Sequence, residues 1–115
     1  MAFTYTSRGS GSQGYGTSAT ISSFTPAADS LLILVGASTA THPITSVSGH
    51  GTWAQISGSP VSIPYSARLS VYACLPGSSP SAASVTASWA ANGSQHISIL
   101  EITGADTSSI ANAII

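Results

Sequence analysis

The chain contains two kinds of apolar pattern, and both are typical of β-strands. In residues 17–24, small and apolar side chains recur with a period near two and alternate with Ser and Thr, as in a strand with one exposed face. Residues 31–35 form a continuous apolar run, bounded by Asp29-Ser30 and by Gly36. Such a run is typical of a strand that is buried on both faces. The pattern therefore predicts a half-exposed strand followed by a fully buried one.

Shorter strand-like segments follow. They are residues 44–48, 52–56 and 68–74, and the glycines of Gly49-His50-Gly51 predict a turn between the first two. Residues 57–66 contain one glycine and two prolines, which predict an irregular loop. No window of a dozen residues has the apolar spacing of an amphipathic helix.

Two further strands are predicted near the end of the chain, at residues 84–89 and 96–102. Between them lies Asn92-Gly93, the dipeptide best suited to the positive φ angles of a type I′ turn. We therefore predict a β-hairpin that spans both segments.

These segments predict an all-β chain of about seven to eight short strands, arranged as an antiparallel β-sandwich or jelly roll. A chain of 115 residues has room for one domain. In our interpretation, residues 17–115 form this β-sandwich domain. Residues 1–16 are rich in Gly and Ser and predict a flexible N-terminal arm, which either frays or becomes ordered against a neighbouring subunit.

Charged residues make up only 4% of the chain, and the formal net charge is −1, whereas ordinary soluble domains carry about 25% charged residues. The two arginines, Arg8 and Arg68, are too few and too far apart for phosphate contacts, so nucleic-acid binding is excluded. Disorder is excluded because disordered chains combine low hydrophobicity with high net charge. No apolar run is longer than the five residues of 31–35, against the ~20 of a membrane-spanning helix. The composition favours a neutral domain that assembles with neighbours.

No motif for metal binding or catalysis stands out. The three histidines, His42, His50 and His96, lack the close spacing of metal ligands. Cys74 is the only cysteine, which excludes a disulfide within the chain. The sequence also lacks the Gly-x-Ser-x-Gly motif of a nucleophile elbow. We therefore predict a protein that is not an enzyme and has no catalytic, cofactor-binding or metal-binding residues.

Two acids, Glu101 and Asp106, are close in sequence and could form the carboxylate pair of a glycosidase. The preferred interpretation is structural: an acid at a strand end that accepts a backbone hydrogen bond or pairs with Arg68.

Carbohydrate binding is the alternative function, because an aromatic ring can stack on the apolar face of a sugar. The candidate platform consists of His50, Trp53 and Tyr65, near the Gly-rich loops. Trp89 lies on a predicted strand and is expected in the core instead. The alternative is thus a carbohydrate-binding β-sandwich module.

Four stretches carry a resemblance to known proteins: residues 24–35, residues 44–47 with 51–53, residues 69–72, and residues 101–107. In order and spacing they are similar to a loose group of tailed-bacteriophage virion proteins. The resemblance covers about residues 20–108, and it implies a β-sandwich or jelly roll without catalytic residues that decorates a capsid or forms part of a tail. Similar phage sequences continue through further strands, whereas this chain ends on the apolar residues 110–115. Either a terminal strand pairs with a neighbour, or the chain is a fragment of a longer protein.

The expected function is therefore that of a non-enzymatic virion structural protein: a capsid decoration or cement protein, or a tail or fibre component. The expected partners are copies of the chain itself, with a trimer as the favoured homo-oligomer, and other virion proteins such as a major capsid protein. The N-terminal residues lack the basic and apolar regions of a secretory signal, so we expect assembly in a host bacterial cytoplasm. The candidate assembly contacts are Phe3, Tyr5, Arg8, Tyr15, Ile114 and Ile115.

Overall fold

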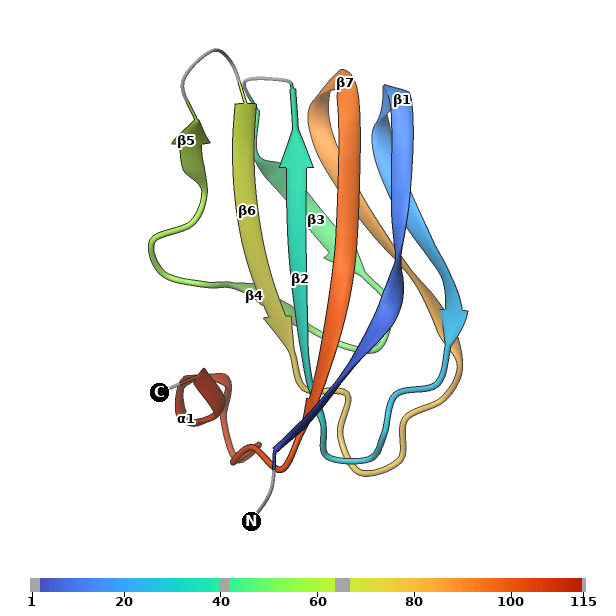
Figure 1. Ribbon diagram of the computed structural model, residues 1–115, viewed down its shortest axis with the longest axis vertical. Helices are drawn as coiled ribbons and strands as arrows, with labels where there is room; N and C mark the ends of the chain where they lie inside the picture. The colour runs from blue at the N-terminus through green and yellow to red at the C-terminus, as the bar shows by residue number, and fades with distance from the viewer. Residues whose placement is uncertain (1–2, 40–41, 64–66, 115) are drawn as a thin grey trace.

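The structure is a computed structural model that describes residues 3–39, 42–63 and 67–114 (Figure 1). Within these ranges the elements are, in chain order, the strands β1 (Thr4–Phe24), β2 (Leu31–Ser38), β3 (Ile44–Ser48), β4 (Trp53–Gln55), β5 (Val61–Ile63), β6 (Ala67–Cys74) and β7 (Ala83–Thr103), followed by the helix α1 (Ile110–Ile114). Every strand pairing in these ranges is antiparallel. The predicted all-β, antiparallel fold class is confirmed.

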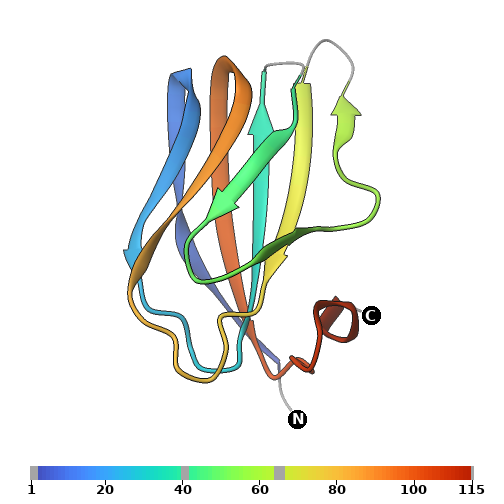
Figure 2. The same cartoon turned by 180° about the vertical axis from the view of Figure 1, so that it is seen from behind.

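In the described residues, the seven strands belong to one continuous sheet. The main order is β1-β7-β2-β6-β4, while β3 pairs with β7 and β5 pairs with β6. β1 and β7 are each 21 residues long, and they pair from Thr4 opposite Thr103 to Phe24 opposite Ala83. Both strands bend near the point where Gly16 lies opposite Gly93, so the sheet folds over on itself (Figures 1 and 2).

This bend divides the sheet into two layers. The front layer contains β2, β4, β5 and β6, together with residues 4–13 of β1 and 95–103 of β7. The back layer contains β3, together with residues 18–24 of β1 and 83–89 of β7. Figure 2, the view from behind, shows β3 lying across β2. The sequence predicts short strands throughout. In the structure, β1 and β7 are long, and each runs through both layers.

Residues 4–16 form the first half of β1 and are not an arm that precedes the sheet, so the predicted division of the chain at residue 16 is corrected. Residues 4–13 pair with β7 through backbone hydrogen bonds, and such bonds need no apolar side chains. Gly11 also allows a close approach, because a Cβ atom at this position would overlap the carbonyl group of Thr20. A composition rich in Gly and Ser is therefore compatible with a strand at the edge of this sheet.

The predicted hairpin around Asn92-Gly93 is replaced by a different pairing. Both residues lie inside β7, neither has a positive φ angle, and both halves of β7 pair with β1. The local turn signal is overridden because β1 offers hydrogen-bond partners along nearly the whole of β7.

The core lies between the two layers and draws side chains from both. The buried apolar cluster consists of Ala19, Ile21, Leu32, Leu34, Ile44, Tyr72, Cys74, Val85, Ala87, Trp89, Ile97 and Ile99. Trp89 is only 4% exposed, so its predicted core position is confirmed. Burial of such side chains stabilises the fold by about 25 cal/mol per Å² of apolar surface.

β2 is covered fully on only one of its faces. Leu32 and Leu34 are 0% exposed and belong to the core cluster. On the opposite face, Ile33 is half-buried and Val35 is 37% exposed. The uninterrupted apolar run predicts burial of both faces. On the outer face only Leu31, at the start of the strand, is buried (2% exposed), while Ile33 and Val35 stay partly exposed.

The predicted turn between β3 and β4 is confirmed. Gly49, His50 and Gly51 have φ angles of 107°, 65° and 133°, a left-handed conformation that glycine adopts without steric cost. The apolar C-terminal residues, in contrast, form the helix α1 and not the strand considered above. In the part of the chain that the structure describes, no helix is long and apolar enough to span a membrane.

Candidate functional site

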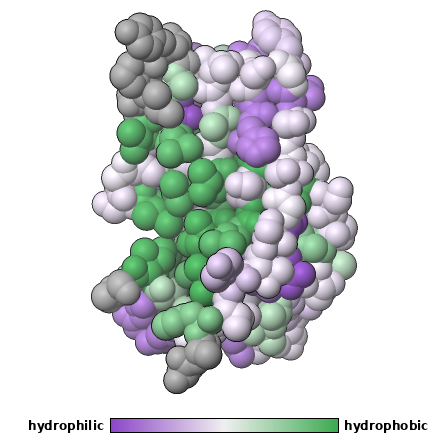
Figure 3. Space-filling model, viewed as in Figure 1, coloured by the Kyte–Doolittle hydropathy of each residue, from purple (hydrophilic) through white to green (hydrophobic). Residues whose placement is uncertain are grey.

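The outer face of the front layer carries a contiguous group of apolar side chains. Directly opposed residues of neighbouring antiparallel strands point to the same side of a sheet, and Val35 lies opposite Ser98 of β7 and Val71 of β6. The outward-pointing apolar residues of β2, β6 and β7 include Ile33, Val35, Leu69, Val71, Leu100 and Ile102, and we call this set the front face. Figure 3 shows it as a continuous hydrophobic area in the middle of the molecule.

The front face is partly exposed: Ile33, Leu69, Val71 and Ile102 are half-buried, and the other two side chains are more exposed. Val35 is 37% exposed and Leu100 is 38% exposed. Val61 of β5, which lies opposite Leu69, is 50% exposed. Several outward-pointing apolar side chains of this layer are thus in contact with water in the single chain.

The outer face of the back layer has the opposite character, and we call it the back face. Thr20 and Thr86 lie side by side there, with their Oγ1 atoms 2.9 Å apart. Ser46 of β3 lies opposite Ser88 of β7, and the hydroxyl of Thr45 donates to the carbonyl oxygen of Ser88 at 3.1 Å. Hydroxyl groups are readily hydrated, so this face needs no cover.

None of the five charged residues belongs to the front face, and three of them lie on the inner side of the front layer. Arg8 and Glu101 form an ion pair on the inner side of the front layer. Arg68 lies opposite Ser38, whose 3% exposure also marks the inner side. Asp29 precedes β2 and Asp106 follows β7. The front face is therefore both apolar and free of formal charge.

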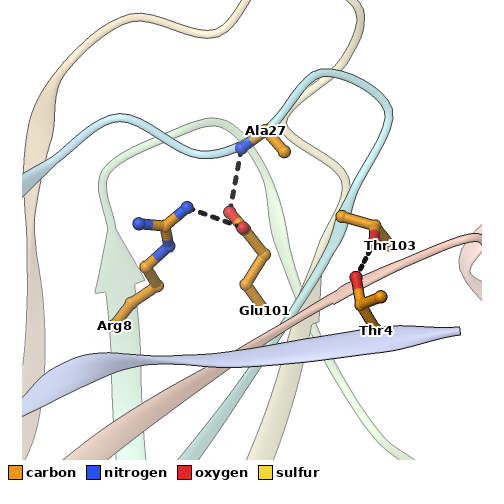
Figure 4. A network of polar contacts seen from close by, with 5 residues as sticks. All are labelled: Thr4, Arg8, Ala27, Glu101 and Thr103. Atoms are coloured by element: carbon orange, nitrogen blue, oxygen red, sulfur yellow. Dashed lines mark hydrogen bonds and ion pairs between the residues drawn. The ribbon is translucent and has the colours of Figure 1, made fainter.

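The Arg8–Glu101 pair links β1 and β7 with the loop between β1 and β2 (Figure 4). Glu101 is 2% exposed; its Oε1 accepts from Nη2 of Arg8 at 2.7 Å, and its Oε2 accepts from the backbone N–H of Ala27 at 2.9 Å. The guanidinium carbon of Arg8 lies 5.8 Å from the centre of the Phe24 ring. Both carboxylate oxygens of Glu101 are occupied, so this acid holds the fold together; its ion-pair partner is Arg8 instead of the predicted Arg68.

Two of the three residues of the predicted sugar platform, His50 and Trp53, lie in the described ranges, and both make packing contacts within the fold. Nε1 of Trp53 donates to the carbonyl oxygen of Gly49 at 2.6 Å, and the half-buried Trp53 ring packs against the core. The ring of His50 lies 4.5 Å from that of Phe24. Tyr65 lies outside the described residues.

The predicted assembly contacts separate into two groups. Phe3, Tyr5 and Tyr15 are 69%, 78% and 75% exposed, as a contact residue must be before assembly. Arg8 is instead engaged with Glu101. Ile114 is 40% exposed and lines an apolar hollow of about 350 Å³ with Ile56 and Ile110, whereas Ile115 lies outside the described residues.

Sequence reasoning did not name the front face as a site. Its signal was present in residues 31–35, which are apolar at every position. A strand with this pattern has apolar side chains on both sides, so the face that the core does not use is apolar as well.

Burial shifts the pKa values of two further side chains, Cys74 and His50. Cys74 is 0% exposed, and desolvation raises the pKa of its thiol to about 11. Burial also lowers the pKa of His50 below its ordinary value of 6.5, against the opposing effects of the Ala83 backbone and the Glu101 charge.

The lowered pKa of His50 predicts a pH-dependent stability. The folded state binds fewer protons than the unfolded state just below pH 6.5, so the free energy of unfolding is expected to fall as the pH decreases from 6.5 towards about 5. The variant His50→Asn, in which asparagine tolerates the positive φ, should show a smaller decrease in melting temperature over this range. His42→Asn, at an exposed loop position, is the matched control. Equal pH slopes for wild type and His50→Asn would contradict the prediction.

No group of three His, Cys, Asp or Glu side chains within the described ranges could hold a metal ion. No protein-family model matches the chain, no curated protein is significantly similar to it, and no solved structure matches its fold.

Proposed function

We propose that this chain is a non-enzymatic structural protein of a virion, either a capsid decoration or cement protein or a tail or fibre component. The observation that carries the proposal is the front face. An apolar surface without formal charge is stabilised when a neighbour removes it from water, so the chain is suited to a permanent place in an assembly.

The scarcity of charge supports the same function. Small soluble domains are kept apart in solution by net charges of about 2 to 8, whereas this chain has a net charge of −1 and no lysine. Because the net charge is so small, neighbouring subunits in a shell or tail would repel one another only weakly, which favours their assembly. The similarity of residues 24–35 and 101–107 to phage virion proteins gives this assembly its proposed location.

Three residue types that often act in catalysis are used here in contacts that stabilise the fold: Glu101, Cys74 and His50. Both oxygens of Glu101 accept hydrogen bonds, and Cys74 is buried with a raised pKa. His50 packs on Phe24. These contacts support a structural role and give no specific support to sugar binding, because the Trp53 ring is also used in packing.

Sedimentation velocity and light scattering of the purified chain test the proposal. At micromolar concentration the chain is expected to form a defined oligomer that persists at high salt, because salt screens charges and leaves apolar contacts intact. A soluble monomer over this concentration range would contradict the proposal. The gene neighbourhood separates its two forms: an adjacent major capsid gene favours decoration, and adjacent tape-measure or tail genes favour a tail component.

A further inference from the structure

We infer that the occupant of the front face is a second copy of this chain, which contributes its own front face to a two-fold symmetric dimer. The inference rests on the proposed function and specifies which surface assembles and with what. It differs from the trimer expected from the sequence.

The first argument is that the front face has no formal charge, so two copies of it can face each other without repulsion. In a two-fold interface the same patch is contributed by both copies, so any charge would lie near its own equivalent. The front face carries none, because the Arg8–Glu101 pair and Arg68 lie on the inner side of the front layer. A net charge of −1 per chain adds little repulsion at longer range.

The second argument is area. The broad side of the molecule, viewed in Figure 1, has principal extents of 42 and 27 Å. A standard protein–protein interface buries about 800 Å² on each partner. The front layer forms this side, so an interface of standard size would include the front face and polar neighbours such as His96 and Ser98.

The third argument is the nature of the surface. β2, β6 and the second half of β7 run side by side across the front layer, so the front face is a sheet surface. Two such surfaces can stack about 10 Å apart, as the two sheets of a sandwich do. Stacking would cover Ile33 and Val35, and β2 would then be buried on both faces, as its apolar sequence predicts.

A two-fold dimer also fits the molecule better than a trimer does. In a closed trimer, each copy presents two different surfaces to its neighbours. The other broad side of this molecule is the back face, with Thr20, Thr86 and Ser46 outward. Of the two broad sides, as far as the described residues show, the front face has the apolar character of an interface core and the back face does not. A two-fold dimer buries the front face of each copy against the other.

The test compares charge substitutions on the two faces of the full-length chain. Val35→Asp places a charge in the centre of the front face and is expected to raise the dimer dissociation constant about 100-fold or more, because like charges are buried without partners. Ser46→Asp adds the same charge to the back face and should leave the dissociation constant unchanged. Both variants are checked for folding by circular dichroism, and Val35→Thr provides a milder change of similar shape.

Mixing Val35→Asp with Val35→Lys tests the symmetry. Opposite charges then lie on the facing surfaces of the two copies, and dimers should reappear in the mixture although each variant alone is monomeric. Association that survives Val35→Asp, a strong effect of Ser46→Asp, or a trimeric wild type would overturn the face-to-face dimer and leave the proposed function standing. A wild-type chain that remains monomeric would contradict both.

Discussion

Glu101→Ala is expected to lower the free energy of unfolding by about 3 kcal/mol. Glu101 is 2% exposed, and its removal leaves the backbone N–H of Ala27 and the guanidinium of Arg8 without their acceptor. The Arg8 side chain is 28% exposed, so water relieves part of its loss. The N–H of Ala27 loses its side-chain acceptor in the loop between β1 and β2.

Denaturant unfolding at low protein concentration, where assembly contributes little, measures this effect. Glu101→Gln should cost less than Glu101→Ala, because the amide oxygen can still accept from Ala27 while the ion pair with Arg8 is lost. Asp106→Asn replaces an exposed acid and is the matched control. In the double variant Arg8→Met/Glu101→Leu, apolar side chains replace the whole pair, which should recover part of the stability. A Glu101→Ala variant as stable as the control would show that the ion pair does not hold the fold.

Leu34→Ala is expected to lower the free energy of unfolding by about 2–5 kcal/mol, the range for a buried leucine that leaves a cavity. Leu34 is 0% exposed and lies in the core cluster between the two layers. Its neighbour Val35 points to the front face and is 37% exposed. Val35→Ala should therefore cost less than about 1 kcal/mol in the isolated chain.

The two alanine variants are compared by thermal and denaturant unfolding at several protein concentrations. The cost of Leu34→Ala should be independent of concentration, because the core belongs to each chain. The cost of Val35→Ala should grow with concentration as assembly begins to contribute to stability. Equal costs for the two variants in dilute solution would contradict the assignment of inner and outer faces.

Local pattern predicted those parts of the fold that depend on neighbours in sequence. The apolar run in residues 31–35 predicted the strand that became β2, and the glycines around His50 predicted the turn before β4. Period-two alternation and turn preferences act over a few residues, so they are visible without knowledge of the fold. The same reasoning placed Trp89 in the core.

Distant pairing decided the parts that local pattern missed. Residues 4–16 lack the apolar alternation of a strand, yet they join the sheet because β7 provides distant backbone partners, from Thr103 opposite Thr4 to Gly93 opposite Gly16. The Asn92-Gly93 signal favoured a hairpin, but β1 pairs with both halves of β7. The Arg8–Glu101 ion pair joins residues 93 positions apart. A single sequence contains no local trace of such pairings.

By itself, the sequence determined that this is a nearly uncharged, antiparallel β protein with one strand that is apolar on both sides. It could not determine which side of that strand forms the core, because Leu32 and Leu34 are no more distinctive in sequence than Ile33 and Val35. The tertiary structure decided this question: β1 and β7 bend together and bring the back layer over one face of β2 only. On the other face Ile33 and Val35 stay partly exposed, and the proposed function rests on that asymmetry.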